Sequence, residues 1–209
     1  MSKGYFITGI GTGVGKTIVS AAICEALEAD YWKPVQCGNI ENTDSKIVKS
    51  LLSNTKTKIH PERFLLKEAK SPHAAAEDEK INISLNDFVL PVSENKIIAE
   101  GAGGLLVPIN NNGDMVSDLI EKLQLPVILV ANFYLGSINH TLLSIEFLIS
   151  HKITPSALIL IPPTNPQSPE IIQNQYKIPC YLMPELKELS PQNINLISNS
   201  LKSFLLTLN

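Results

Sequence analysis

Several features that this sequence lacks narrow its class before any motif is considered. Only three cysteines are present, widely separated and without a C-x-x-C pair: Cys24, Cys37 and Cys180. This usage is typical of reduced thiols in a cytoplasm, and it argues against a disulfide framework or a zinc site. The four histidines stand in unrelated local contexts, which argues against a histidine metal cluster. We therefore expect a cytoplasmic protein.

Long apolar runs and an excess of positive charge are also missing. The longest apolar stretches, near residues 126–131 and 157–163, are too short to cross a bilayer. The formal net charge is −3 and no basic stripe is present, so the sequence gives no sign of the positively charged surface that binds nucleic acid. Neither a membrane nor a nucleic acid is expected as a partner.

What the sequence contains is the pattern of an α/β domain. At 209 residues, with 44% hydrophobic and 18% charged residues, the chain suits one globular domain over residues 1–209. Apolar runs of strand length alternate with amphipathic segments of helix length, which favours βαβ units. We predict a three-layer, doubly wound fold with a mostly parallel sheet and helices on both faces.

The predicted elements follow from this alternation. Strands are expected at residues 5–9, 31–35, 96–100, 126–131, 157–161 and 180–183. Helices are expected from Lys16 onward and at residues 43–52, 115–123, 139–150, 169–176 and 192–206. The stretch 54–95 has weaker signals. Helical segments are expected there after Ser71-Pro72-His73 and from Ser84, and its fold is otherwise left open.

A glycine-rich bend between the first strand and the first helix predicts a phosphate-binding loop. Its glycines are Gly9, Gly11, Gly13 and Gly15, and Lys16-Thr17 follows. Glycines let backbone N–H groups approach an anion, and the helix N-terminus adds a positive dipole. Lys16 would reach the β- and γ-phosphates, and the Thr17 hydroxyl would bind Mg²⁺. Ile10 departs from the strict G-x-x-x-x-G-K-[ST] pattern, and the alternative is a glycine-rich turn that binds nothing. We favour the phosphate loop and a fold of the P-loop NTPase type.

Polar residues at the carboxyl ends of other strands predict the rest of a site, because ligands of open parallel sheets bind at that edge. Glu100 ends an apolar strand in the manner of a second (Walker B) carboxylate. Together with Thr17 and Asp44 it would supply three oxygen ligands for Mg²⁺. Alternatively, Asp44 only interacts with a helix dipole and Glu100 only caps a loop.

Lys33 lies within a strand-like run, where a buried lysine is costly unless it faces an anion. It could extend to water along an apolar surface. The functional interpretation is a second cation beside Lys16, directed at an anionic substrate or at the transferred phosphoryl group.

Taken together, these motifs resemble the dethiobiotin synthetase family. The matching segments occur in the family's order over roughly residues 1–160, with weaker likeness beyond: Thr8-Gly9, Thr12-Gly13-Val14-Gly15-Lys16-Thr17, Lys33-Pro34-Val35 with Gly38, Thr43-Asp44, Ser71-Pro72-His73, Glu100-Gly101-Ala102-Gly103-Gly104 and Leu135-Gly136-Ser137-Ile138-Asn139-His140. The resemblance implies an ATP- and Mg²⁺-dependent ligase of biotin biosynthesis. CO₂ would add to an amine of 7,8-diaminopelargonate, ATP would phosphorylate the carbamate, and the second amine would close the cyclic urea.

The resemblance also implies roles for individual residues. Lys16 and Lys33 would be catalytic, and Thr17, Asp44 and Glu100 would hold Mg²⁺. The nucleotide-binding residues would be Gly13, Val14, Gly15, Lys16, Thr17, Ile18, Asp44, Glu100, Pro184 and Glu185. The substrate would contact Thr12, Lys33, Cys37, Gly103 and Gly104, together with Gly136, Ser137 and Asn139 of a partner protomer, since the family places this site at a homodimer interface.

The chain departs from the family at several positions. Ile10-Gly11 stands in place of a common Thr-Asp, Cys37 in place of a small hydroxyl residue, and Tyr134 where some members have lysine. Ile161-Pro162 replaces an Asn-Asp pair that reads the nucleotide base in many members. We therefore expect weak discrimination among nucleoside triphosphates, with the base contacted by the backbone of residues 162–166 or of Met183-Pro184-Glu185.

Two other classes are alternatives. A ParA/MinD-like nucleotide-switch ATPase would usually have a lysine where Gly11 stands, and it would dock on a membrane or on DNA. The last predicted helix carries only Lys202 as a base, which argues against membrane docking. A small-molecule kinase would need neither Lys33 nor the loop at residues 136–139.

Overall fold

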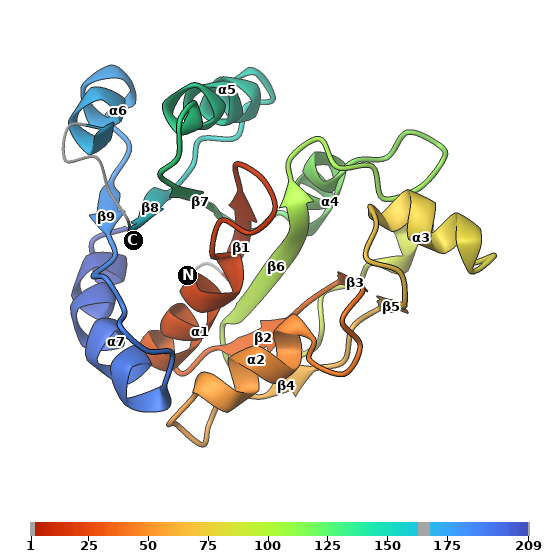
Figure 1. Cartoon of the computed structure of the whole chain (residues 1–209), viewed down its shortest axis with the longest axis horizontal. Coiled ribbons are helices and arrows are strands. Elements are labelled where there is room, and N and C mark those ends of the chain that lie inside the picture. The colour runs from red at the N-terminus through yellow and green to blue at the C-terminus, as the bar shows by residue number, and fades with distance from the viewer. Residues whose placement is uncertain (1–2, 163–167, 209) are drawn as a thin grey trace.

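A seven-stranded sheet runs through the middle of the molecule (Figure 1). The computed structural model describes residues 3–162 and 168–208. The strands of this sheet are β1 (Gly4–Gly9), β2 (Asp30–Trp32), β4 (Ile59–His60), β6 (Ile97–Gly104), β7 (Val127–Asn132), β8 (Ala157–Ile161) and β9 (Cys180–Leu182). A separate pair consists of β3 (Val35–Cys37) and β5 (Phe64–Leu66). The helices are α1 (Lys16–Leu27), α2 (Asp44–Leu51), α3 (Pro72–Asp78), α4 (Val116–Leu123), α5 (Ser137–Ser150), α6 (Ser168–Tyr176) and α7 (Pro191–Leu206), with a 3₁₀ turn η1 (Leu85–Asp87).

The strand order confirms the predicted doubly wound fold. The order is β4-β2-β6-β1-β7-β8-β9, and every pairing between neighbouring strands is parallel. The first strand, β1, therefore lies in the middle, between β6 and β7. The connection through α1 leads from β1 to β2 on one side of it, and the later connection through α4 leads from β6 to β7 on its other side. The strand order therefore reverses beside β1, which is where doubly wound folds bind ligands.

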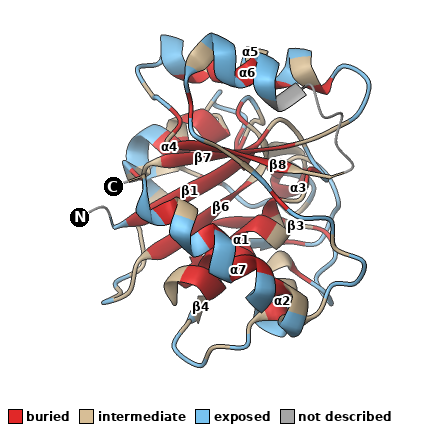
Figure 2. Ribbon diagram, turned by 90° about the vertical axis from the view of Figure 1, so that its left-hand side faces the viewer, coloured by how far each residue is buried: buried red, intermediate tan, exposed pale blue. Residues whose placement is uncertain are grey.

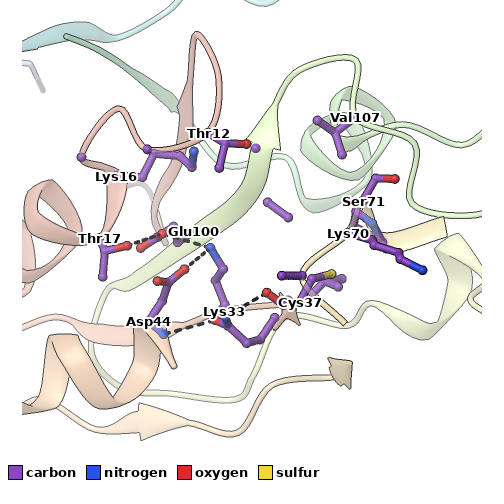
Figure 3. Close-up of a pocket in the computed structure, with 18 of the residues that line it drawn as sticks. Thr12, Lys16, Thr17, Lys33, Cys37, Asp44, Lys70, Ser71, Glu100 and Val107 are labelled. Carbon is purple, nitrogen blue, oxygen red and sulfur yellow. Dashed lines mark hydrogen bonds and ion pairs between the residues drawn. The ribbon is translucent and has the colours of Figure 1, made fainter. Parts of the chain in front are cut away.

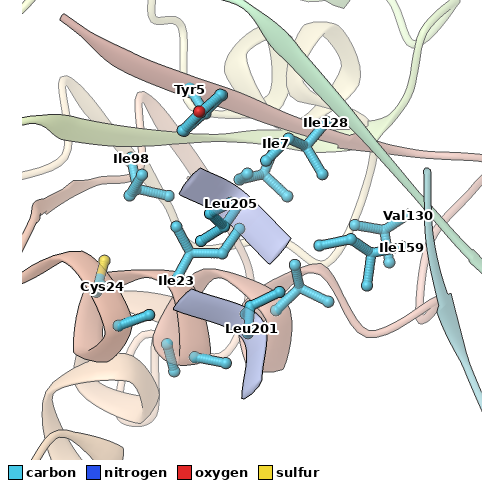
Figure 4. Close-up of a cluster of buried hydrophobic side chains, with 14 of the residues drawn as sticks. Tyr5, Ile7, Ile23, Cys24, Ile98, Ile128, Val130, Ile159, Leu201 and Leu205 are labelled. Carbon is cyan, nitrogen blue, oxygen red and sulfur yellow. The ribbon is translucent and has the colours of Figure 1, made fainter. Parts of the chain in front are cut away.

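Two apolar layers cover the sheet, because side chains alternate between the faces of each strand. In β1, Tyr5 and Ile7 pack toward α1 and α7 (Figure 4). Phe6 belongs to the cluster on the opposite face, with residues of α3 and α4. Figure 2 shows the buried strands enclosed between helices whose outer surfaces are exposed. Because β1 is buried on both faces, the phosphate loop that follows it starts from a rigid support.

One predicted strand is wrong. Residues 31–35 form no single strand: β2 ends at Trp32, and β3 begins at Val35 in the other sheet. Pro34 stands at the break and has no N–H for a ladder bond. Its carbonyl instead accepts hydrogen bonds from the backbone N–H groups of Arg63 and Phe64, at 3.0 and 3.1 Å.

The other predicted elements that differ from the structure do so mainly in where they begin or end. The strand predicted to end at Glu100 continues as β6 through Gly104, since it pairs with β1 as far as Gly9. The segment predicted from Ser84 is only the turn η1, and the helix predicted from Asn139 begins at Ser137. The open stretch 54–95 contributes β4, β5, α3 and η1. The predicted base-contacting residues 163–166 lie outside the described residues.

A buried carboxylate fixes the phosphate-loop helix to its neighbours. Glu25 of α1 accepts hydrogen bonds from the backbone N–H groups of Ser53 and Asn54 at 3.0 and 3.2 Å, and from the side-chain amides of Asn54 and Asn195 at 2.9 and 3.1 Å. The Ser53 hydroxyl also donates to it. Burial alone would raise the pKa of Glu25, but the donors of Ser53 and Asn54 outweigh it and lower the pKa to about 2.

This carboxylate makes stability depend on pH. Its pKa in the folded state lies below the usual value of 4.5, so its contribution is present above pH 4.5 and is lost as the pH falls toward 2. We expect Glu25→Gln to lower the free energy of unfolding at neutral pH by about 2–3 kcal/mol and to flatten its decline below pH 4.5. Urea unfolding at several pH values measures both effects. Glu28→Gln, on the exposed end of α1, is the matched control. An unchanged pH dependence in Glu25→Gln would contradict this assignment.

Candidate functional site

A cavity of about 610 Å³ lies at the carboxyl ends of β1, β3 and β6 (Figure 3). It brings together most of the residues that the sequence singled out. Its walls are formed by Thr12, Gly13, Gly15, Lys16, Thr17, Ile18, Lys33, Val35, Gln36, Cys37, Asp44, Ala69, Lys70, Ser71, Pro72, Glu100, Ala102, Gly103 and Val107.

The glycine-rich bend after β1 curls over one end of this cavity. Gly15 has a φ of +93°, and a Cβ added there would lie 2.2 Å from the Ile161 side chain, so the position requires glycine. Gly15 is also the N-cap of α1 and has no side chain to cap the first-turn N–H groups. Lys16 folds back across the loop, and its ammonium donates to the Gly11 carbonyl at 2.8 Å. Burial and then the nearby Lys33 ammonium lower the pKa of Lys16 to about 8.

Glu100 is the central buried charge of the site, with only 1% of its surface exposed. Its Oε1 accepts hydrogen bonds from the Thr17 hydroxyl at 3.1 Å and from the Lys33 ammonium at 3.0 Å. Its Oε2 accepts one from the Tyr31 hydroxyl at 2.9 Å. Both carboxylate oxygens are therefore compensated, which burial of a charge requires.

Lys33 links Glu100 to the second carboxylate. Its ammonium lies 2.6 Å from Asp44 Oδ2 and also donates to the Gly101 carbonyl at 3.1 Å. Burial alone would lower the pKa of Lys33, but Glu100 and Asp44 raise it above its usual value. Likewise, burial opposes ionisation of Asp44, yet Lys33 and the Thr17 hydroxyl hold the pKa of that carboxyl below its usual range. Lys33, Glu100 and Asp44 therefore form one buried cluster of ion pairs.

The side of the cavity away from α1 is less charged. Cys37 and Val107 line it, and Thr12 borders it (Figure 3). Burial raises the pKa of the Cys37 thiol to about 11, so this cysteine is no nucleophile at neutral pH. Gly103 has a φ of +68° and lies against Val107 and Thr12, which brings the backbone of β6 to the cavity wall.

Seven of the predicted site residues, all within the described part of the chain, do not line this cavity: Val14, Gly104, Gly136, Ser137, Asn139, Pro184 and Glu185. Val14 is instead buried in the apolar core. Pro184 and Glu185 follow β9 and are exposed. Gly104 lines a second hollow of about 460 Å³, which shares Thr12 and Val107 with the first. Gly136 and Ser137 begin α5, whose residues His140, Leu143, Ser144 and Phe147 line that second hollow.

Several residues of the site had no predicted role. Gln36 donates to the Gly38 carbonyl at 3.1 Å and accepts from the Asp44 N–H at 3.1 Å, so it fixes the start of α2. Lys70, Ser71 and Pro72 form an outer wall. Tyr31 lies behind Glu100, and only the strand register could have revealed it: Tyr31 is opposite Ile98, and Glu100 follows two residues later on the same face.

This arrangement of a central parallel sheet, a glycine-rich loop after β1 and a Lys-Thr pair at the start of α1 defines a P-loop NTPase. Solved structures support the fold. MinD from Pyrococcus furiosus aligns over 99% of this chain and 100% of its own, with a TM-score of 0.59 and 13% identity. A plasmid partition protein of Borrelia burgdorferi, solved with AMPPNP, aligns over 97% of each chain with a TM-score of 0.58 and 12% identity. At such low identity, these matches show the fold alone.

Comparison with known sequences identifies the family as well as the fold. A family model described as an AAA domain matches residues 3–193. The ATP-dependent dethiobiotin synthetase of Cytophaga hutchinsonii is 48% identical over 188 residues, covering 88% of this chain and 90% of the relative. That of Christiangramia forsetii is 48% identical over 85% of each chain, and that of Paramagnetospirillum magneticum 41% identical over 82% of each. The chain belongs to the dethiobiotin synthetase family, as the motifs predicted. Over the described residues, no helix is long and apolar enough to cross a membrane.

Proposed function

We propose that this chain is an ATP-dependent dethiobiotin synthetase, a ligase that closes the cyclic urea of dethiobiotin from 7,8-diaminopelargonate and CO₂. The observation that carries this proposal is the pair of buried lysines. Lys16 and Lys33 line one cavity from two different elements, beside a phosphate loop. A phosphate loop alone needs one lysine. A second buried ammonium suits a reaction in which another anion, here a carbamate, attacks the γ-phosphate.

Each step of this reaction forms or transfers an anionic group that a nearby lysine could stabilise. One amine of the diamine attacks CO₂ and loses a proton, which gives a carbamate. A carbamate oxygen then attacks the γ-phosphorus of ATP, and ADP leaves. Finally the second amine attacks the carbonyl carbon, and the C–O bond to phosphate breaks, so that inorganic phosphate and the cyclic urea form. Lys16 stabilises charge on the phosphates and Lys33 stabilises the carbamate and the transferred group, since charge developing in a buried site is best met by fixed cations.

The donor set fits Mg²⁺. The Thr17 hydroxyl and the Asp44 and Glu100 carboxylates converge on one point of the cavity and offer the oxygen ligands that this ion prefers. Among the described residues, no group of three or more His, Cys, Asp or Glu side chains competes as a metal site. When bound, the ion would neutralise charge on the phosphates. In this structure Lys33 contacts both carboxylates. Binding of Mg²⁺ to those carboxylates would replace these contacts, so the Lys33 ammonium would be able to turn toward the substrate.

We further propose that the substrate's carboxylate tail is bound by a second copy of the chain. Large apolar side chains are exposed around the second hollow: Leu106, Tyr134, Leu135 and Leu143. Such a patch is typical of an interface. Gly136 and Asn139 lie at the N-terminus of α5, which favours an anion. Asn139 is exposed, whereas Ser137 is buried and its N–H donates to the Tyr134 carbonyl at 2.9 Å, so Asn139 is the better placed of the two.

Phosphate release tests the main proposal. We expect release from ATP to require both diaminopelargonate and bicarbonate. Lys33→Ala should reduce it by at least about a hundredfold, because a fixed cation is lost from the transition state, while ATP binding changes little. Lys46→Ala, on the exposed face of α2, is the control and should retain full activity. Phosphate release that does not depend on the diamine would instead favour the ParA/MinD-like nucleotide switch.

Nucleotide selectivity is a second prediction. Ile161 ends β8 against Gly15 of the phosphate loop and has no polar group with which to read a base. We therefore expect similar kcat/KM values for ATP, GTP and CTP under saturating diamine and bicarbonate. A hundredfold preference for ATP would show that other residues discriminate the bases.

A shared site predicts complementation between two defective variants. Asn139→Ala should raise the KM for the diamine with a smaller effect on kcat, since it acts on the tail and not on the reacting groups. Mixing it with Lys33→Ala at low diamine should restore activity, because a mixed dimer contains one site with both native residues. Mixtures no more active than their components, despite exchange of protomers, would place Asn139 outside the site.

A further inference from the structure

One buried hydroxyl group close to the site has no part in the steps above. Tyr31 of β2 is fully buried, and its hydroxyl donates to Glu100 Oε2 at 2.9 Å. The other oxygen, Oε1, faces Thr17 and Lys33. The two oxygens of Glu100 thus have separate surroundings: one is directed into the protein and one toward the cavity.

The position of Tyr31 follows from strand register. In the parallel pairing of β2 with β6, Tyr31 lies opposite Ile98. Glu100 follows Ile98 by two residues and therefore points to the same face of the sheet. On that face Tyr31 packs into the same apolar cluster as Ile98 and Ile7. The ring is fully buried among these side chains, and in this position its hydroxyl reaches Glu100.

We propose that Tyr31 is a positioning residue, whose hydroxyl holds Oε2 of Glu100 so that Oε1 alone is presented to Thr17 and the metal side of the cavity. The proposal rests on the proposed function, in which Glu100 belongs to the Mg²⁺ site. A carboxylate with one oxygen fixed from behind cannot rotate between two ligand geometries. Partners of this kind behind a metal ligand typically affect metal affinity by 10–100-fold.

Packing alone does not require this hydroxyl. Tyr5 of β1 is a second buried tyrosine in the same apolar cluster, and within the described residues its hydroxyl takes no part in the hydrogen bonds of Glu100 or Lys33. Phenylalanine has the same ring without the hydroxyl, so the substitution at either position removes that one group. At Tyr31, burial and the adjacent Glu100 raise the pKa well above the usual value, so the hydroxyl remains a donor. Tyr5 therefore provides a matched control for the loss of a buried hydroxyl.

Calorimetric binding of AMP-PNP, with and without Mg²⁺, tests the proposal without relying on turnover. For Tyr31→Phe we expect an unchanged Kd in EDTA and a roughly tenfold loss of the tightening that Mg²⁺ causes in the native protein. Tyr5→Phe should behave as the native protein in both conditions. Glu100→Gln should lose most of the Mg²⁺ effect, and adding Tyr31→Phe to it should cause no further loss, since the two residues act through one contact.

The outcomes separate this inference from the function on which it rests. If Tyr31→Phe retains the full Mg²⁺ effect while Glu100→Gln loses it, Tyr31 is only a core residue and the metal role of Glu100 stands. If Glu100→Gln also retains the effect, the proposed metal site is wrong. An equal loss in Tyr5→Phe and Tyr31→Phe would point to general loosening of the core and would overturn the positioning role.

A second measurement covers the case in which Tyr31→Phe does not fold. The native chain has five tyrosines, so labelling with 3-fluorotyrosine gives five ¹⁹F signals. Phenylalanine variants of the other four, Tyr5, Tyr134, Tyr176 and Tyr181, assign the signal of Tyr31 by elimination. That signal should shift when AMP-PNP is added with Mg²⁺ and stay in place when AMP-PNP is added with EDTA. A signal that does not respond to Mg²⁺ overturns the proposal.

Discussion

The need to compensate the buried charge of Glu100 organises this site. A carboxylate that is almost fully buried is tolerated only when donors or cations surround it. Here the donors come from separate parts of the chain: Thr17 from α1, Tyr31 from β2 and Lys33 from the link between β2 and β3. The phosphate-loop helix, the strand β2 and the link that follows β2 are therefore bound to one side chain of β6. Loss of Tyr31 would remove the donor of Oε2, and loss of Thr17 or Lys33 would leave Oε1 with one donor in place of two. A shift of any of these elements would therefore weaken the compensation of a buried charge.

The break at Pro34 has a second structural effect. Lys33 stands immediately before it, at the point where the chain leaves the main sheet for the pair β3 and β5. Had the strand continued through Val35, Lys33 would have been one more residue of a regular ladder. Because the chain leaves the ladder, its ammonium can reach Glu100, Asp44 and the Gly101 carbonyl together. The displaced strand β3 then provides Gln36 and Cys37 as the opposite wall of the cavity.

The parts of the site that the sequence predicted are those whose signals are local. A strand, a glycine-rich bend and Lys-Thr at a helix start are contiguous, and Glu100 ends an apolar run, so both could be recognised from a few residues. The division of residues 31–35 between two sheets could not, because three-residue strands have too few positions to show a period. The contact between Tyr31 and Glu100 depends on the register between β2 and β6, which no local pattern encodes. The outer wall formed by Lys70, Ser71 and Pro72 comes from the stretch 54–95, whose irregular elements depend on tertiary packing.

The charges of the cavity explain why its two buried lysines differ. Beside the phosphate loop, Lys16 and Lys33 lie close to Asp44 and Glu100, whereas Lys70 of the outer wall is paired with Asp78. Lys33 takes both carboxylates as partners, and its pKa is raised above the usual value, with burial outweighed by Glu100 and Asp44. Among the described residues, the Lys16 ammonium has a backbone carbonyl, that of Gly11, as its one hydrogen-bond partner, and burial and Lys33 lower its pKa to about 8. Lys16 is therefore the cation that lacks a counter-ion, and a polyanionic phosphate chain would supply one. Lys33 can stabilise a second anion only after its carboxylates find another cation. In the proposed function, the phosphates of the metal–nucleotide complex would provide the anion for Lys16, and the metal would provide the second cation for the two carboxylates that Lys33 now pairs with.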